Sequence, residues 1–247
     1  MQAMIFAAGL GTRLQPLTSD KPKALVEIHG KSLLERCLLN LKKQGINDVV
    51  VNVHHFSEQI IHFLEANNNF GMHIQVSDET AELLDTGGGI LKAKSLFKPN
   101  EPILILNVDI LTNLSFDALL DFHQKEKALA SLVVRQRKTS RYLLFGKNHQ
   151  LTGWENQQTG DRKIARIAQI EESTPYAFSG IQLIQPELLD LIEEQGKFSI
   201  IDLYLRLAKS QTISAFVDNQ SIWMDLGKYE QLEEAESLVK KMELLSD

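Results

Sequence analysis

The chain has 247 residues, of which 43% are hydrophobic and 23% charged, and its formal net charge is -6. This composition is typical of a globular protein and excludes a disordered or fibrous chain. The negative charge argues against broad nucleic-acid binding, which needs a positive field over much of the surface. The single cysteine, Cys37, cannot form an intramolecular disulfide, and no apolar run approaches membrane-spanning length. We therefore expect a cytoplasmic protein that binds neither membranes nor nucleic acid.

The first half of the chain alternates short apolar runs with amphipathic stretches, which is typical of strand-helix-strand units around a parallel sheet. Strands are expected at residues 3–8, 48–53, 73–77 and 102–109. Helices are expected to begin at Ser32, whose hydroxyl can cap the first turn, and at Ser57. A third helix is expected to follow the consecutive glycines at 87–89 and to run through residues 91–96.

From about Leu129 the pattern changes to shorter strand-like runs broken by turns, which predict hairpins and an antiparallel extension. Helical stretches are expected at residues 186–194 and 199–209, then a strand at 213–217 and a charged helix from Lys228 to about Leu245. No linker or internal repeat divides the chain. We therefore predict one α/β domain with a Rossmann-like, mostly parallel sheet flanked by helices and a small antiparallel β extension over the site.

The stretch AAGLGTRLQPLTSDKPKAL, residues 7–25, follows the first predicted strand and contains two glycines and three basic residues. Glycine-rich loops of this kind let backbone N–H groups approach an anion. A dinucleotide-binding GxGxxG motif would need a glycine where Leu14 stands, and Pro16 and Pro22 prevent a helix from starting at once. A P-loop would need a Gly-Lys-Ser/Thr tripeptide, which does not follow either glycine. What remains is a long irregular loop suited to a triphosphate.

This loop resembles the signature of the sugar nucleotidyltransferases, which join a nucleoside triphosphate and a sugar 1-phosphate to give a nucleotide sugar and pyrophosphate. The matching positions are Gly9, Gly11, Thr12, Arg13, Pro16, Thr18, Pro22, Lys23 and Leu25. Three later segments resemble the family pattern in the same order: DTGGGI at 85–90, LNVDIL at 106–111 and WMDLG at 223–227. The resemblance spans nearly the whole chain and implies a single domain, with residues 1–128 as the nucleotide-binding half and 129–247 as the sugar-binding half.

The resemblance implies catalytic roles for Arg13 and Lys23. Arg13 can contact two phosphate oxygens at once and would stabilise the leaving pyrophosphate, and Lys23 would follow the α-phosphate or the incoming sugar phosphate. The nucleotide-binding residues implied by the same motifs are Ala8, Gly9, Gly11, Thr12, Arg13, Gly87 and Gly88. For Gly87 and Gly88 the alternative is that they cap the following helix.

Two acids at strand ends are candidate metal ligands. Asp109 ends an apolar strand at the carboxyl edge of the predicted parallel sheet, where open α/β sheets bind ligands, and Asp225 ends a later strand. The resemblance identifies both as metal-binding residues, and Mg²⁺ bridging phosphate oxygens typically takes one or two carboxylates from the protein. Mg²⁺ is therefore the expected cofactor. The alternative for either acid is a helix cap or a structural salt bridge.

The segment FSGI at 178–181 resembles the sugar-contacting strand of the family, in which Gly180 would give room and Ser179 a hydrogen bond. A glycine at a bulge of an ordinary strand is the alternative. Thr86 and Glu171 complete the expected sugar-binding residues. Many relatives carry a Glu-Lys-Pro triplet just before this strand, and here Ser173 stands in place of the lysine.

The expected partners are a nucleoside triphosphate and a sugar 1-phosphate, joined by in-line attack without a covalent enzyme intermediate. UTP is the favoured donor and N-acetylmuramate 1-phosphate the favoured acceptor, because the compact length, DTGGGI and FSGI resemble that branch of the family. GTP with mannose or heptose 1-phosphate, and thymidylyl or uridylyl transfer to glucose 1-phosphate, remain alternatives. A nucleotide-sugar sensor without catalysis is the alternative outside enzymes.

Overall fold

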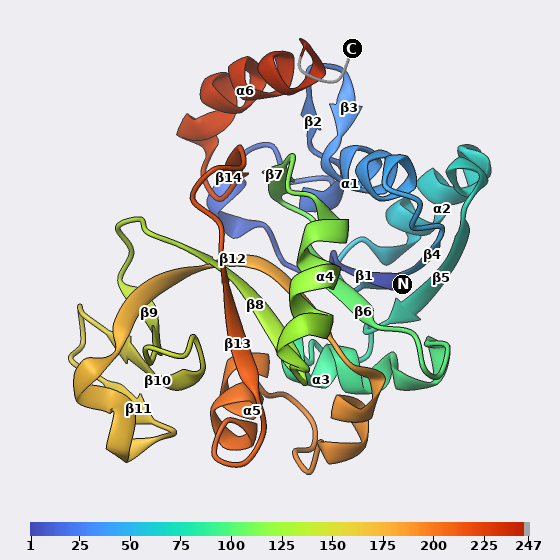
Figure 1. Cartoon of the computed structure of the whole chain (residues 1–247). Helices are drawn as coiled ribbons and strands as arrows, with labels where there is room; N and C mark the ends of the chain where they lie inside the picture. Colours follow the sequence, from blue (N-terminus) through green and yellow to red (C-terminus); the bar gives the residue numbers. More distant parts are fainter. Residues whose placement is uncertain (245–247) are drawn as a thin grey trace.

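A mixed sheet of ten strands runs through the molecule (Figure 1), whose computed structural model describes residues 1–244. Its parallel part contains, in spatial order, β6 (Ile103–Asn107), β1 (Gln2–Phe6), β4 (Asp48–Val53) and β5 (His73–Asp78). These strands confirm the four predicted in the first half of the chain. All four end at the same edge, as parallel strands must, and their loops therefore meet there.

Helices cover both faces of the parallel part, which gives the molecule two hydrophobic cores. Ala3 and Ile5 of β1 face a core that includes buried residues of α1 (Leu33–Lys43), α2 (Ser57–Ala66) and α4 (Phe116–Glu126). Met4, which points to the opposite face, packs in the core with α3 (Asp85–Lys92) and α5 (Ile200–Leu207). Ser32 accepts the N–H of Glu35 and caps α1, as predicted.

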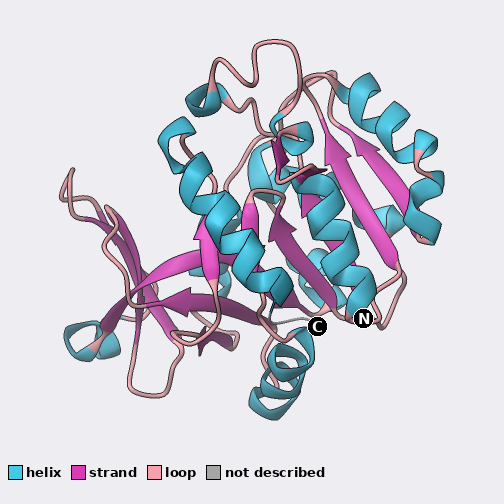
Figure 2. Cartoon of the chain, turned by 90° about the horizontal axis from the view of Figure 1, so that it is seen from above, coloured by secondary structure: helices cyan, strands magenta, loops and turns pink. Residues whose placement is uncertain are grey.

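The antiparallel extension is confirmed and is organised by β12 (Thr174–Ile184), an eleven-residue strand. Residues 174–176 pair with β9 (Arg141–Phe145), residues 177–184 pair with β8 (Ala130–Arg135) across a register shift, and residues 181–184 also pair with β6. The remaining strands of the extension are β10 (Leu151–Asn156) and β11 (Arg162–Ile164), while β13 (Ile213–Val217) lies parallel to β8. The strands β9 to β11 stand to one side of the parallel part in Figure 2.

Two further strand pairs lie outside this sheet: β2 (Glu27–Ile28) with β3 (Lys31–Ser32), and β7 (Ile110–Thr112) with β14 (Trp223–Asp225). The structure corrects the expected helix at 186–194, which is a 3-10 helix over Pro186–Leu191. The last helix, α6 (Leu232–Leu244), follows a 3-10 turn at Tyr229–Gln231, and the predicted end at Leu245 lies outside the described residues. None of the helices between residues 1 and 244 has the length and apolar character that a membrane crossing requires.

The three consecutive glycines lie inside α3 rather than before it, which corrects the helix expected at 91–96. The reason is a close approach by the segment that precedes α5. A Cβ atom on Gly87 would lie 2.2 Å from the ring of Phe198, and one on Gly88 would lie 2.3 Å from the carbonyl oxygen of Gly196. The N–H of Gly87 also donates to the Phe198 carbonyl at 2.9 Å. The glycines therefore let two segments distant in sequence pack backbone against backbone.

We predict that Gly88→Ala lowers the free energy of unfolding. A glycine-to-alanine change in a helix gains about 0.5–1 kcal/mol, but forcing a methyl group against a backbone carbonyl costs about 1–3 kcal/mol, so the clash decides the sign. Urea unfolding should show a lower midpoint at an unchanged slope. Gly9→Ala is the matched control, because no described atom lies within 4 Å of its added Cβ. Equal midpoints for Gly88→Ala and the native chain would contradict this packing role.

Candidate active site

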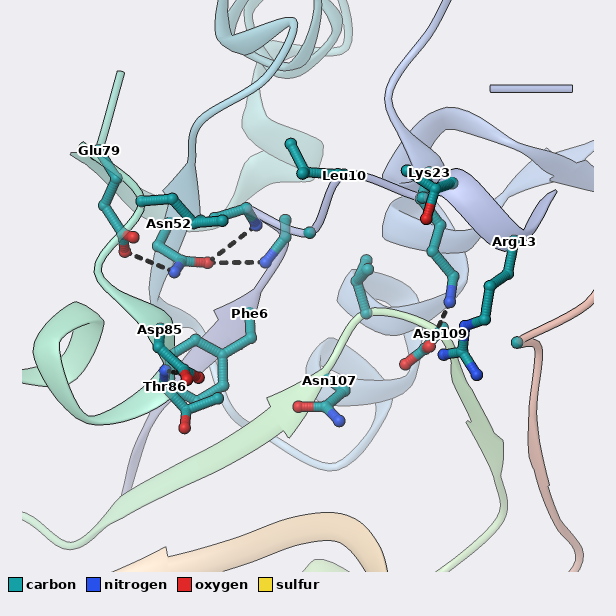
Figure 3. A pocket seen from close by; sticks show the side chains of 18 of the residues that line it. Phe6, Leu10, Arg13, Lys23, Asn52, Glu79, Asp85, Thr86, Asn107 and Asp109 are labelled. Atoms are coloured by element: carbon teal, nitrogen blue, oxygen red, sulfur yellow. Dashed lines mark hydrogen bonds and ion pairs between the residues drawn. The ribbon is translucent and has the colours of Figure 1, made fainter. Parts of the chain in front are cut away.

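Asn52, at the carboxyl end of β4, holds the start of the loop that follows β1. Its Oδ1 accepts the N–H groups of Ala7 at 2.7 Å and Ala8 at 3.3 Å (Figure 3). Its Nδ2 donates to Oε1 of Glu79 at 2.7 Å, and the other Glu79 oxygen accepts the N–H of Leu84 at 3.2 Å. Glu79 is fully buried. The loop therefore begins from a fixed backbone position rather than from a flexible strand end.

The rest of the loop folds back on itself around Gly11. This residue has φ of 65°, and its carbonyl accepts the hydroxyl hydrogen of Thr18 at 2.8 Å. A Cβ atom there would lie 3.1 Å from side-chain atoms of both Thr18 and Lys23, in a conformation that favours glycine in any case. A short 3-10 turn, Thr12–Leu14, follows and buries Leu14, which leaves the neighbouring Arg13 exposed.

The pairing of β7 with β14 brings the two predicted metal-binding acids to one place. Asp225 stands opposite Ile110 in this pair, directly after Asp109 in the chain. The N–H of Leu226 donates to the Asp109 carbonyl at 2.9 Å and fixes the register. The β7–β14 pair thus brings the backbone at Asp109 next to the backbone at Asp225, although the two acids are far apart in the sequence.

The basic residues of the loop reach the same place. Lys23 forms an ion pair and hydrogen bond with Oδ2 of Asp109 (Figure 3), and the two side chains are only 12% and 17% exposed. A Cβ atom on Gly227 would lie 2.9 Å from Oδ1 of Asp225 and 3.6 Å from both terminal nitrogens of Arg13. Four charged groups predicted from separate motifs therefore converge at the carboxyl edge of the parallel strands.

A cavity of about 490 Å³ opens at this edge. The predicted residues that line it are Ala8, Gly9, Gly11, Thr12, Arg13, Lys23, Thr86 and Asp109. Phe6, Asn52, Glu79, Asp85, Asn107 and Lys197 also line it and were missed by the sequence analysis. Asp225 stands two residues before Gly227, a lining residue. Among the described residues, the lining includes none from β9 to β11.

The remaining predicted residues lie around the cavity at different distances. Gly87 and Gly88 are buried in α3 immediately after Thr86, whose hydroxyl oxygen accepts the N–H of Ile200 at 3.0 Å. Glu171 is exposed in a 3-10 helix, Ile167–Glu172, which packs on the extension. The structure therefore brings Thr86 to the cavity, but no residue of that 3-10 helix is among the described residues lining it.

The predicted sugar strand is part of β12, next to β6. Gly180 has φ of 73° and lies in a register shift between Phe178 and Gln182, so it is both a bulge residue and a place of close approach. A Cβ atom on it would lie 2.9 Å from Nδ2 of Asn107, which lines the cavity. Ser179 is buried, and its hydroxyl has no hydrogen-bond partner among the described residues.

The missed residues carried weak signals in the sequence. Asn52 is a polar residue inside the apolar run DVVVNV, and Glu79 follows directly after the next strand. A polar residue among buried neighbours needs a hydrogen-bond partner, but the partner becomes visible only when the two strands are placed side by side.

The chain matches a known protein family over almost its whole length. The family model described as nucleotidyl transferase matches residues 2–242. The chain belongs to this family. N-acetylmuramate alpha-1-phosphate uridylyltransferase of Caulobacter vibrioides is 33% identical over 232 residues, which cover 91% of each chain. The enzyme of the same name from Neisseria meningitidis is 30% identical, over 96% of this chain and 98% of that one. The resemblance found in the sequence is therefore confirmed.

Other relatives extend the likeness. Mannose-1-phosphate guanyltransferase of Yarrowia lipolytica is 29% identical over 92% of this chain, but the match covers 61% of that longer protein. The solved structure of HddC from Yersinia pseudotuberculosis, complexed with GMP-PN, aligns with a TM-score of 0.75 at 21% identity, covering 96% of this chain and 98% of that one. The structural likeness supports the fold, and the curated relatives show a sugar-1-phosphate nucleotidyltransferase enzyme.

Nucleotidyltransferases of this family generally use a divalent metal. The residues present fit such an ion, because Asp109 lines the cavity, Oδ1 of Asp225 lies beside Gly227 of the same lining, and both acids supply hard oxygen ligands. Within residues 1–244, no group of three or more His, Cys, Asp and Glu residues is arranged to hold a metal. Two carboxylates suit an ion that takes its other ligands from substrate phosphates and water.

We predict that Asn52→Ala lowers the free energy of unfolding by about 2–4 kcal/mol, because two backbone N–H groups lose their acceptor and the buried Glu79 loses a donor. Chemical denaturation measures this change. Asn47→Ala is the control, since Asn47 is exposed and makes one long side-chain bond of 3.4 Å to Gly45. A loss no larger than that of the control would show that Asn52 does not anchor the loop.

Proposed function

We propose that this enzyme transfers the uridylyl group of UTP to N-acetylmuramate 1-phosphate, giving UDP-N-acetylmuramate and pyrophosphate. The observation that carries the reaction is that Arg13, Lys23 and Asp109 line one cavity and that Asp225 lies beside Gly227 of the same lining. The choice of substrates is supported by the two relatives of that name, which match over nearly their whole length. Guanylyl transfer from GTP to mannose 1-phosphate is the second candidate, supported by the relative from Yarrowia lipolytica.

The reaction is an in-line displacement at the α-phosphorus of the triphosphate. An oxygen of the sugar 1-phosphate forms a bond to this phosphorus while the bond to the bridging oxygen of pyrophosphate breaks. Both substrates are anionic, so the main obstacles are their repulsion and the charge that develops on the leaving group. Arg13 would bind the pyrophosphate through two donors, and Lys23 would follow the α-phosphate. The reaction therefore needs positioning of the substrates and neutralisation of their charge, and it needs no general base.

Asp109 and Asp225 would hold Mg²⁺. When bound, this ion withdraws charge from phosphate oxygens and helps to orient them. Lys23 neutralises Asp109 before the substrates arrive, since the two side chains form an ion pair in the structure. An arriving phosphate offers Lys23 a second anionic partner, and this keeps the charge of the site balanced through the reaction.

The loop of residues 8–12 would bind the nucleotide, with its start fixed by Asn52. Gly87 and Gly88 would contribute through the packed backbone of α3 rather than through the N–H of Gly87, which already donates to Phe198. On the acceptor side, Thr86 lines the cavity, and Ser179 and Gly180 lie on the strand next to Asn107.

The test of the proposed substrates is pyrophosphate release from a panel of nucleoside triphosphates and sugar 1-phosphates, with and without Mg²⁺. We expect the highest kcat/KM with UTP and N-acetylmuramate 1-phosphate and a loss of turnover when EDTA replaces Mg²⁺. A preference for GTP with mannose 1-phosphate would select the second candidate. No release from any pair in the presence of Mg²⁺ would contradict the reaction itself.

We further predict that Asp225→Asn and Lys23→Ala each lower kcat by about a hundredfold or more, since the first removes a proposed metal ligand and the second a positive charge that faces the reacting phosphates. Circular dichroism and thermal unfolding establish that the variants are folded. Lys21→Ala is the matched control, because Lys21 lies on the same loop but is not among the residues lining the cavity. Native-like turnover of Asp225→Asn would contradict the assignment of Asp225 as a metal ligand. Native-like turnover of Lys23→Ala would contradict the proposed contact between Lys23 and the phosphate.

A further inference from the structure

Two arginines and a tryptophan form a cluster near the proposed metal ligand Asp225. Arg135 ends β8, Arg137 follows two residues later, and Trp223 begins β14. The guanidinium carbons of Arg135 and Arg137 lie 5.0 Å and 4.7 Å from the centroid of the Trp223 ring, within the range of cation-π attraction. With Gln136 and Asn219 these residues line an open hollow. We refer to Arg135, Arg137 and Trp223 as the arginine cluster.

Hydrogen bonds attach the arginine cluster to the proposed sugar strand. Nε1 of Trp223 donates to the carbonyl oxygen of Ser179 at 2.8 Å. An Nη atom of Arg137 donates to the carbonyl oxygen of Phe178 at 3.1 Å. The residue after Ser179 in the strand is Gly180, at the bulge, whose backbone lies close to the side chain of Asn107 in the cavity. The cluster is therefore held in a fixed position on the strand proposed to contact the acceptor.

The arginine cluster is also aligned with the proposed metal ligand. Trp223 and Asp225 are two residues apart in β14, so their side chains point to the same face of the strand. Burial lowers the pKa of Arg137, and the nearby Asp225 carboxylate opposes this shift. At the other end of the same segment, Arg13 lies next to Gly227. Asp225 thus stands between the guanidinium of Arg13 on the triphosphate loop and that of Arg137, which donates to the acceptor strand β12.

The two arginines differ in how their charge is balanced. Arg135 forms an ion pair with Asp218 at 3.0 Å, and Asp218 also accepts two backbone N–H groups. Arg137 forms no ion pair with a carboxylate among residues 1–244. The Nε atoms of both arginines are buried without a hydrogen-bond partner among the described residues, so the difference lies in the carboxylate that only Arg135 has. A partly buried guanidinium with an unused donor is costly unless an anion completes it, so this position favours an anionic ligand.

We propose that Arg137, oriented by Trp223 and the Phe178 carbonyl, binds an oxyanion of the acceptor sugar phosphate. This rests on the proposed function, which places the acceptor beside Ser179 and Gly180. Two groups supply the required chemistry: the lactyl carboxylate of N-acetylmuramate and the 1-phosphate that every acceptor carries. The planar fork of arginine is suited to both, since each offers two oxygens in one plane.

The test is the steady-state kinetics of Arg137→Gln with two acceptors. N-acetylmuramate 1-phosphate carries the carboxylate, and N-acetylglucosamine 1-phosphate is the same sugar without the lactyl group. We expect the KM of the acceptor to rise about tenfold or more, because a charged hydrogen bond is lost, while the KM of UTP stays unchanged. A rise confined to N-acetylmuramate 1-phosphate identifies the carboxylate as the bound group. An equal rise for both acceptors identifies the 1-phosphate.

Two further variants separate binding from structure. Arg162→Gln removes the same charge from the exposed strand β11 and should leave both KM values unchanged. Arg137→Lys keeps the charge without the planar fork, so it should recover part of the loss, and it replaces Arg137→Gln if that variant does not fold. Unchanged acceptor KM in a folded Arg137 variant, or an equal rise in the KM of UTP, would overturn the proposal.

Failure of the substrate assignment gives a different result. If the native enzyme prefers GTP and mannose 1-phosphate, the proposed donor and acceptor are wrong, and the KM of mannose 1-phosphate in Arg137→Gln then tests the oxyanion contact. An increase would support binding of the 1-phosphate, and no change would contradict it. If the native enzyme releases no pyrophosphate from any pair, both proposals fall together.

Discussion

The site depends on the antiparallel pairing of β7 with β14, two strands of three residues each. This pairing, fixed by the bond from Leu226 to the Asp109 carbonyl, joins the end of the parallel sheet to a segment near the end of the chain. Asp109, Asp225 and Arg13 meet because of it. A sugar-1-phosphate nucleotidyltransferase must neutralise two anionic substrates in one place, and a short strand pair is what brings the carboxylates and the guanidinium together here.

Rigidity on the triphosphate side comes from polar groups that are buried and paired. Asn52 links the backbone at Ala7 and Ala8 to the buried carboxylate of Glu79, which in turn accepts the N–H of Leu84 just before α3. One network therefore holds the start of the glycine loop and the approach to α3. Networks of this kind specify a single arrangement because an unpaired member in the interior is costly. Because the backbone at Ala7 and Ala8 is held in place, the loop beyond Gly9 can contact a ligand from a fixed starting position.

Much of this arrangement could be predicted from the sequence, and the exceptions share a physical cause. Asp109 and Asp225 stood out because each ends an apolar strand, and the loop of Arg13 and Lys23 stood out by its mixed residue types. The glycines were wrongly predicted to precede the helix. They lie inside α3 because the segment around Phe198, far along the chain, packs closely against them. Arg137 had no signal of its own, because its significance comes from Trp223 and Phe178, residues that only the folded strands bring beside it.

The most direct test of this account is a crystal structure of the enzyme with UDP-N-acetylmuramate and Mg²⁺. We expect one cation about 2.1 Å from a carboxylate oxygen of Asp109 and from one of Asp225, in contact with a phosphate oxygen of the nucleotide. Arg13 and Arg137 should then lie on opposite sides of that cation. A cation bound away from either aspartate would contradict the metal site at Asp109 and Asp225, and a nucleotide without contact to residues 8–12 would contradict nucleotide binding by that loop.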